Sequence, residues 1–209
     1  MTRSIAALIM AAGYASRFGR CKQLTQVGGK ALLQHSIDSA QAVCPGKVFA
    51  VSGAWHEALR KAMHSEELRN VILIYHPDWS EGLGSSIARG VTGIGSHVDG
   101  ILVLLADQIA VTAEDLLPLR RKFTGDNIVC SVYAGSRGVP AIFGRSSFGK
   151  LRELSGDRGA KALLYDEHVP VVECPLDHAS IDVDTPEDLH RWVTTRDHAY
   201  GLEARRKCV

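Results

Sequence analysis

A loop of small and cationic residues follows the first apolar run of this 209-residue chain. Small residues and Gly13 let backbone N–H groups come close to an anion. Arg17 can offer a two-pronged fork to phosphate oxygens, and Lys22 a point charge. These residue types at this spacing predict a phosphate-binding loop. The loop reads Ala11, Ala12, Gly13, Tyr14, Ala15, Ser16, Arg17, Phe18, Gly19, Arg20, Cys21, Lys22.

The charge around this loop also favours an anionic ligand. Residues 1–37 contain no Asp or Glu, although the whole chain has a net charge of only +1. A nearly neutral chain has no overall attraction for nucleic acid or a membrane, so we expect neither as a partner. Chance clustering of solvated cations is the alternative explanation. The cations of this segment are Arg3, Arg17, Arg20, Lys22 and Lys30.

Two familiar nucleotide-binding motifs are absent. A Walker loop needs Gly-Lys followed by Ser or Thr, but Gly29 and Lys30 are followed by Ala31. A dinucleotide fingerprint needs glycine spacings that Gly13 and Gly19 do not give. The sequence therefore disfavours a nicotinamide-dependent dehydrogenase and predicts a phosphate cradle of another kind.

Three carboxylates stand where they could hold a divalent cation. Asp107 follows the apolar run 99–105, while Asp182 and Asp184 are two residues apart and share one face in extended backbone. Magnesium takes one or two carboxylates together with substrate phosphates, so these residues predict a Mg²⁺ site. The alternatives are that Asp107 caps a loop and that Asp182, Asp184 or Thr185 only caps the helix that follows.

The alternation of apolar runs and helical periods predicts one Rossmann-like α/β domain, a three-layer α/β/α fold with a mostly parallel sheet. The carboxyl ends of parallel strands share one edge, where ligands bind. The expected strands are 4–10, 47–52, 71–75, 99–105 and 169–174, with 128–133 and 139–144 as a possible antiparallel pair. The expected helices are 31–43, 55–63, 146–154 and 160–166, with others beginning near residues 85, 112 and 185.

Composition limits the remaining classes. Five cysteines without a Cys-x-x-Cys spacing argue against a disulfide framework and a zinc site. Cys21 lies between two cations, which could lower the pKa of its thiol, but we interpret it as an incidental loop residue. No membrane span or signal peptide is evident, so we expect a cytoplasmic protein.

Taken together, the motifs resemble the molybdenum cofactor nucleotidyltransferases, and more narrowly their cytidylyltransferase branch. The resemblance implies a nucleotide-diphospho-sugar transferase-like domain over residues 1–192, followed by a helix or tail at 193–209. The matching pieces, in order, are residues 11–24, 29–33, 81–86, 104–108, 138–143, 156–161 and 182–188.

The resemblance also implies roles for individual residues. Lys22, Arg17 and Asp107 would be catalytic, and Asp107 and Asp184 would bind the metal. The nucleotide would lie against Ala11, Ala12, Gly13, Arg17, Lys22, Gly82, Ser85 and Ser86. The acceptor would face Gly156, Asp157, Arg158 and Lys161.

The implied activity is transfer of CMP from CTP to the terminal phosphate of Mo-molybdopterin, with release of pyrophosphate and transient contact with a client molybdoenzyme. Related guanylyltransferases carry a second glycine where this chain has Ala12, whose methyl group should favour a pyrimidine. Ile109 and Val139 depart from the family pattern on the acceptor side. Another phosphorylated acceptor, or a non-catalytic cofactor chaperone, remains an alternative.

Overall fold

A seven-stranded sheet forms the centre of the protein, whose computed structural model describes residues 3–195. The strand order is β5-β4-β1-β6-β8-β7-β9. β1 is parallel to β4 and β6, β4 to β5, and β7 to β9, whereas β8 is antiparallel to both β6 and β7. The expected antiparallel pair and the mostly parallel α/β sheet are confirmed. The strands are β1 (Ile5–Ala11), β4 (Val48–Ser52), β5 (Ile72–Tyr75), β6 (Gly100–Leu105), β7 (Ile128–Tyr133), β8 (Ser136–Gly144) and β9 (Val171–Pro175).

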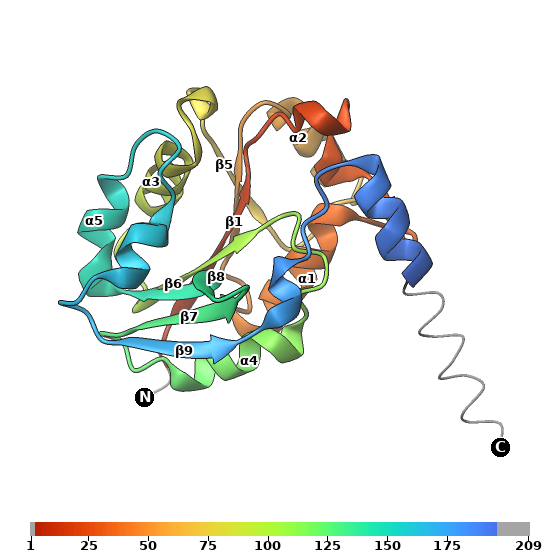
Figure 1. Cartoon of the computed structure of the whole chain (residues 1–209). Coiled ribbons are helices and arrows are strands. Elements are labelled where there is room, and N and C mark those ends of the chain that lie inside the picture. The colour runs from red at the N-terminus through yellow and green to blue at the C-terminus, as the bar shows by residue number, and fades with distance from the viewer. Residues whose placement is uncertain (1–2, 196–209) are drawn as a thin grey trace, which may run out of the picture.

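Helices cover both faces of the sheet and give the expected three layers (Figure 1). α1, α2 and α4 pack on one face, and α3 and α5 on the other. β1 is buried along its whole length because successive side chains enter opposite cores, which explains its unbroken apolar sequence. The helices are α1 (Leu32–Val43), α2 (His56–His64), α3 (Leu83–Ile94), α4 (Ala113–Lys122) and α5 (Phe148–Arg152), and residues 186–195 form a last helix.

Some local structure differs from the expectation. A small antiparallel hairpin, β2 (Gln26–Val27) with β3 (Lys30–Ala31), precedes α1. Gly28 and Gly29 have φ values of 57° and 77°, in the left-handed region that glycine enters without strain. The expected helix 160–166 is a 3₁₀ helix, Ala160–Tyr165, instead of an α-helix.

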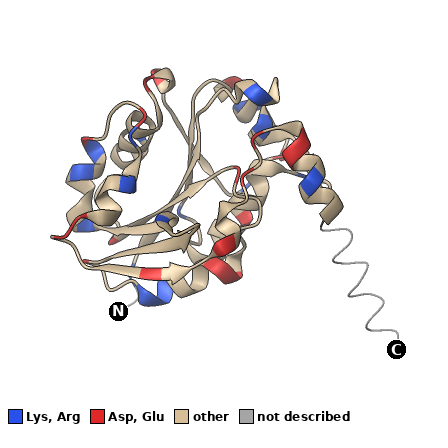
Figure 2. Ribbon diagram, viewed as in Figure 1, with Lys and Arg blue, Asp and Glu red and all other residues tan. Residues whose placement is uncertain are grey.

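Backbone hydrogen bonds bring distant segments to the carboxyl edge of the sheet. Ala106 N–H donates to the Met10 carbonyl at 3.2 Å, which joins the ends of β6 and β1. Val183 N–H donates to the Asp107 carbonyl at 3.1 Å, which places the 182–184 segment beside β6. Charged side chains lie mostly on helices and loops, and strands β1, β4 and β6 carry none (Figure 2).

The C-terminal segment is described only in part. The last helix continues past the expected boundary at residue 192, and most of the 193–209 segment lies outside the described residues. Within residues 3–195, no helix is both long enough and apolar enough to span a bilayer.

Candidate active site

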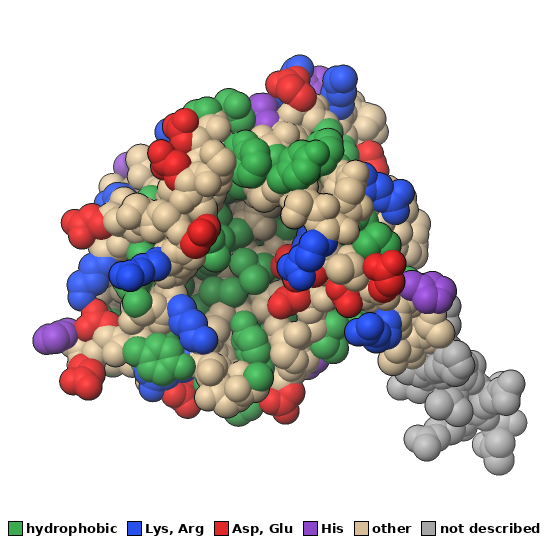
Figure 3. All heavy atoms as spheres, turned by 45° about the horizontal axis from the view of Figure 1, so that its top comes forward, with side chains coloured by type: hydrophobic (Ala, Val, Ile, Leu, Met, Phe, Trp, Pro, Cys, Tyr) green, Lys and Arg blue, Asp and Glu red, His purple; other side chains and the backbone are tan. Residues whose placement is uncertain are grey.

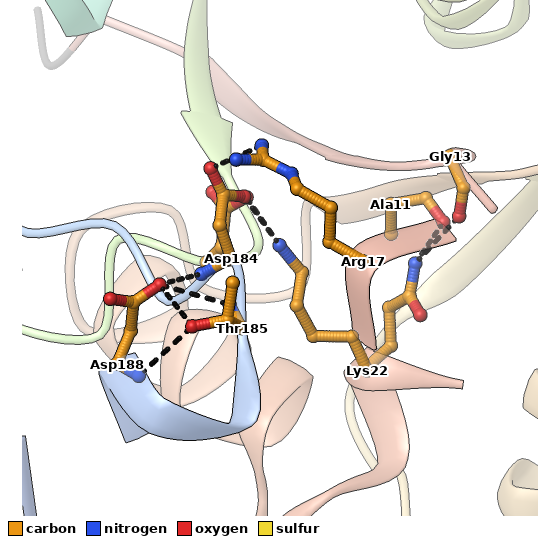
Figure 4. Close-up of polar contacts among 9 residues, drawn as sticks. Ala11, Gly13, Arg17, Lys22, Asp184, Thr185 and Asp188 are labelled. Carbon is orange, nitrogen blue, oxygen red and sulfur yellow. Dashed lines mark hydrogen bonds and ion pairs between the residues drawn. The ribbon is translucent and has the colours of Figure 1, made fainter. Parts of the chain in front are cut away.

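A buried lysine joins two acids at the edge of the sheet. The Lys22 Nζ donates to Asp107 Oδ2 at 2.8 Å and to Asp184 Oδ1 at 3.2 Å. Arg17 Nη2 donates to the other carboxylate oxygen of Asp184 at 2.8 Å (Figure 4). The side chain of Lys22 is 9% exposed, whereas that of Arg17 is 69% exposed. The structure thus brings together four of the predicted site residues from three separate segments.

Burial explains why this lysine needs both acids. A buried ammonium group is costly unless it is paired and hydrogen-bonded, and Lys22 has two carboxylates within hydrogen-bonding distance. Its place at the start of a 3₁₀ turn, Lys22–Leu24, directs it inward from the phosphate loop. The Lys22 ammonium group is therefore held in place before any ligand binds, where it could contact the phosphate oxygens of a nucleotide.

The acids also fit a divalent cation that is completed by substrate. Asp107 Oδ1 is buried and has no hydrogen-bond donor among the described residues. Within residues 3–195, no three His, Cys, Asp or Glu side chains are grouped to hold a metal ion. Two carboxylates with phosphate oxygens are the arrangement that Mg²⁺ commonly uses, so Asp107 and Asp184 fit such an ion only when a nucleotide is present.

Asp182 is more loosely attached to this site. Partial desolvation, followed by the negative charges of Asp107 and Asp184, raises the pKa of Asp182 to about 6, and Lys22 opposes this rise. The residue is nevertheless exposed at the surface, and no hydrogen bond of its side chain is seen. It contributes negative charge near the predicted metal ligands.

The last helix is capped by residues that leave both candidate acids free. Thr185 Oγ1 accepts a hydrogen bond from Asp188 N–H at 3.1 Å, and Asp188 Oδ2 accepts from Thr185 N–H at 2.9 Å (Figure 4). This is a capping box, in which the side chain of each residue accepts a hydrogen bond from the backbone N–H of the other. Of the three alternatives for the cap, Thr185 is therefore confirmed, whereas Asp182 and Asp184 are wrong. Asp184 donates only its backbone N–H to this arrangement.

A glutamine missing from the predictions holds the phosphate loop. Gln23 is buried, and its side-chain amide donates to the carbonyls of Ala11 at 3.0 Å and Gly13 at 3.3 Å (Figure 4). These bonds fix the loop just where it leaves β1. Its only sequence signal was its place after Lys22. Burial raises the pKa of the neighbouring Cys21 thiol, which agrees with its interpretation as an incidental loop residue.

A cavity of about 440 Å³ begins at this loop. Figure 3 looks onto this face of the molecule, where a hollow floored by hydrophobic side chains has acidic and basic side chains on either side. The sequence reasoning missed its floor, Met10 and Leu105, and one wall, Trp79. The residues that line the cavity are Met10, Ala12, Gly13, Trp79, Ser80, Gly82, Leu83, Ser86, Leu105, Asp107 and Asp157.

Half of the eight predicted nucleotide contacts line this cavity, namely Ala12, Gly13, Gly82 and Ser86, whereas Ala11, Arg17, Lys22 and Ser85 do not. The Ser85 hydroxyl is buried, donates to the Gly82 carbonyl at 3.0 Å and contacts His76 Nε2 at 3.1 Å. Gly82 has a φ of 116°, and a Cβ there would lie 2.5 Å from Gly156 O and Asp157 Oδ1. Gly156 and Asp157, predicted to face the acceptor, are thus packed against the cavity's own wall.

A second cavity of about 340 Å³ adjoins the first, and Met10, Leu83 and Leu105 line both. Of the residues predicted to face the acceptor, Lys161 lines this second cavity, whereas Arg158 and Gly156 line neither cavity. Arg137 enters the lining without having been predicted. The other residues that line this cavity are Ile87, Val103, Tyr133, Ala134, Ser136, Gly138, Val139, Gly159, Ala160 and Leu164.

Comparison with known proteins supports the resemblance found in the sequence. The model of the MobA-like NTP transferase domain matches residues 7–171, which is most of the chain. This chain belongs to the MobA-like NTP transferase family.

Three curated relatives match at low identity over nearly the whole chain. Nicotine blue oxidoreductase of Paenarthrobacter nicotinovorans is 28% identical over 90% of this chain and 95% of its own length. The purine catabolism protein PucB of Bacillus subtilis is 26% identical over 87% and 92%. Molybdenum cofactor cytidylyltransferase of Escherichia coli is 23% identical over 88% and 93%.

Solved structures agree with this assignment. Rv0371c of Mycobacterium tuberculosis has a TM-score of 0.77 and 26% identity, covering 92% of this chain and 99% of its own. A second structure of Rv0371c is a complex with manganese, with a TM-score of 0.72, 26% identity, and coverage of 91% and 98%. A divalent cation is thus bound by a related protein of the same fold.

Proposed function

We propose that the chain transfers CMP from CTP to the terminal phosphate of Mo-molybdopterin and releases pyrophosphate in a Mg²⁺-dependent reaction. The observation that carries this proposal is the buried Lys22 between Asp107 and Asp184, at the mouth of a cavity walled by the phosphate loop. Transfer of a nucleotidyl group needs cationic groups and a place for a metal beside the triphosphate, and both are present.

The reaction is an in-line displacement. A terminal phosphate oxygen of the acceptor attacks the α-phosphorus of CTP, and the bond from that phosphorus to the pyrophosphate oxygen breaks. The nucleophile is already ionised, so no general base is assigned. Lys22 and Arg17 would exchange their carboxylate partners for phosphate oxygens and neutralise the charge that develops.

Asp107 and Asp184 would hold the metal ion. When bound, Mg²⁺ supplies a Lewis acid that offsets the charge of the triphosphate and of the departing pyrophosphate. The two acids need not move far, because Lys22 keeps them on the same side of the cavity mouth. Asp182 adds negative charge that attracts the cation without being assigned as a direct ligand in this scheme.

The acceptor would occupy the second cavity. It adjoins the nucleotide cavity through Met10, Leu83 and Leu105, so a ligand there lies next to the nucleotide. Lys161 and Arg137 give this largely apolar chamber two cations that could bind an acceptor phosphate. Val139, one of the departures from the family pattern, also lines it, so acceptor identity is where this chain differs from its relatives.

The base preference rests on Ala12. This residue lines the nucleotide cavity, and its methyl group takes up space that a glycine would leave open. A guanine is larger than a cytosine, and one methyl group typically discriminates by about 1–3 kcal/mol. CTP is therefore the proposed donor.

The names of the relatives are compatible with other activities at the same site. Transfer to another phosphorylated acceptor uses the same nucleotide half, while a chaperone that only carries the cofactor to a client molybdoenzyme would not need the Lys22 network. One relative is named as an oxidoreductase, but this chain lacks the glycine fingerprint of dinucleotide-binding loops.

Release of pyrophosphate from CTP, GTP, ATP and UTP, each with and without molybdenum cofactor, tests the proposal. We expect release with CTP that depends on both the cofactor and Mg²⁺. Release that requires another phosphorylated acceptor would replace the substrate while keeping the reaction. Absence of release with every nucleotide, together with cofactor binding, would favour the chaperone, and oxidation of NADH or NADPH would favour a redox role.

A further inference from the structure

Three aromatic rings stand in a nearly parallel row beside the phosphate loop. The ring centroids of Tyr14 and Trp55 are 5.3 Å apart with an interplanar angle of 13°, and those of Tyr14 and Trp79 are 6.4 Å apart at 17°. The Trp55 Nε1–H donates to the Tyr14 carbonyl at 2.9 Å, which fixes this ring against the loop. Tyr14 remains 51% exposed between the two tryptophans. No step of the proposed reaction uses these rings.

Trp79 is the member of the row that enters the nucleotide cavity. It lines the cavity and is half-buried, with its inner edge against the core. A Cβ on Gly53 would lie 2.4 Å from Trp79 Cβ and 2.6 Å from the Ala12 carbonyl. The indole therefore sits close to Ala12, the residue to which the base preference is assigned, and only glycine at position 53 allows this approach.

Trp79 and Asp107 both line the cavity, and the strand order indicates that they lie well apart across it. Asp107 follows β6, Ala12 follows β1, and Gly53 follows β4, which lies on the other side of β1. Neighbouring strands are about 4.8 Å apart, so the ends of β6 and β4 are separated by about 10 Å. A nucleotide whose phosphates meet Lys22 and Asp107 can therefore extend its base toward Trp79.

We propose that Trp79, braced by Tyr14 and Trp55, is the surface on which the base of the bound nucleotide stacks. This inference rests on the proposed nucleotidyltransferase function and adds to it the group that binds the base. Stacking suits an aromatic ring held rigid by its neighbours, because little conformational freedom is lost when the ligand binds. The stack holds any base by its π-face, while Ala12 limits its size.

Calorimetric titration with two ligands tests this role. The ligands are CTP with Mg²⁺ and inorganic triphosphate with Mg²⁺, which has the phosphates but no base. Stacking on an aromatic side chain contributes about 1–3 kcal/mol per base, so Trp79→Ala should weaken CTP binding roughly 5- to 150-fold. Binding of inorganic triphosphate should stay within about twofold, because it does not reach the stack.

Further variants separate stacking from a loss of structure. Trp79→Phe keeps an aromatic ring and should recover most of the CTP affinity. CTP should quench the fluorescence of the wild type but not that of Trp79→Phe, in which Trp55 and Trp192 remain as emitters. Tyr165→Ala is the matched control, because it removes another half-exposed aromatic ring that lines neither cavity.

The outcomes are distinguishable. Equal CTP affinity in wild type and Trp79→Ala, or equal loss of CTP and inorganic triphosphate binding, would overturn the stacking role while leaving the proposed function intact. If Trp79→Ala does not fold, unchanged CTP quenching in Trp79→Phe overturns it and loss of quenching supports it. A wild-type protein that binds inorganic triphosphate but no nucleotide would overturn both proposals.

Discussion

At the scale of single residues, Lys22 is the most constrained group in the site. It is nearly inaccessible to water, yet it carries a charge that two acids compensate. Both acids come from segments far from Lys22 in the sequence, so the position of its ammonium group depends on the fold. Gln23 completes this unit by fixing the loop backbone on the other side of the turn.

Lys22→Ala should lower the rate of pyrophosphate release by roughly 10²–10³-fold or more, because a charge that stabilises the transition state is removed. Unfolding in urea should remain cooperative, since Asp107 and Asp184 can then take up solvent cations or water. Lys30→Ala, which breaks an exposed ion pair with Asp38, is the control and should keep its activity. Turnover near the wild-type value in Lys22→Ala would remove its assigned role.

Ala12→Gly should raise the use of GTP relative to CTP. The change removes a methyl group from the wall of the nucleotide cavity and gives a purine more room. The expected change in selectivity is about tenfold, at the lower end of what one methyl group contributes. The measurement is the ratio of kcat/KM for the two nucleotides, and an unchanged ratio would remove the argument for cytosine.

At the scale of elements, two capping boxes begin helices with different tasks. Thr112 and Asp115 form one at the start of α4, and Thr185 and Asp188 form the other at the start of the last helix. The first box only supports the layer that covers the sheet. The second directly follows Asp184, so its geometry sets the direction of an acid in the site.

Thr112→Ala and Thr185→Ala should therefore separate stability from activity. Each removes an N-cap, which typically costs about 1 kcal/mol of unfolding free energy. We expect Thr112→Ala to keep its kcat, and Thr185→Ala to lose activity beyond any effect on folding. Urea unfolding and pyrophosphate release measured on both variants give the comparison; equal activities would show that the second cap does not orient Asp184.

The contribution of the α4 cap to folding stability should depend on pH. Although burial opposes it, hydrogen bonds from Thr112 and His178 lower the pKa of Asp115. A carboxyl with a lowered folded-state pKa stabilises the fold above its unfolded pKa of about 3.9 and loses this contribution as the pH falls through the folded value. The stability gap between wild type and Asp115→Asn should thus be full at pH 7 and narrow near pH 3. A gap that widens in acid would contradict the assignment.

At the scale of the whole molecule, the sheet serves as a frame on which two neighbouring cavities share a floor. Met10 and Leu105 come from adjacent parallel strands and line both cavities. Loops from four strand ends supply the walls. The acids are already neutralised by Lys22 and Arg17, so the frame does not depend on a metal ion for its integrity.

Removal of divalent cations should accordingly stop the reaction without loosening the fold. We expect EDTA to abolish pyrophosphate release and added Mg²⁺ or Mn²⁺ to restore it, while the thermal unfolding midpoint in the absence of nucleotide stays unchanged. Calorimetric unfolding with and without EDTA is the measurement. A lower midpoint in EDTA would indicate a structural ion, which this arrangement does not need.

The sequence by itself determined the local features. The phosphate loop is contiguous, so its small residues and cations could be recognised directly, and apolar periodicity located the main strands and helices. Thr112 and Thr185 indicated where two helices begin, because a helix cap depends on residues only three or four positions apart. The family could be recognised because these short motifs keep their order along the chain.

Only the tertiary structure decided how distant segments meet. Lys22 and Asp184 are 162 positions apart, and their pairing depends on the strand order and on the backbone bond between Val183 and Asp107. Trp79 and Arg137 belong to no sequence motif. They line the cavities only because the fold packs their segments against glycines, strands and 3₁₀ turns. Contacts of this kind arise from the folded arrangement of many elements, which no local pattern of residues records.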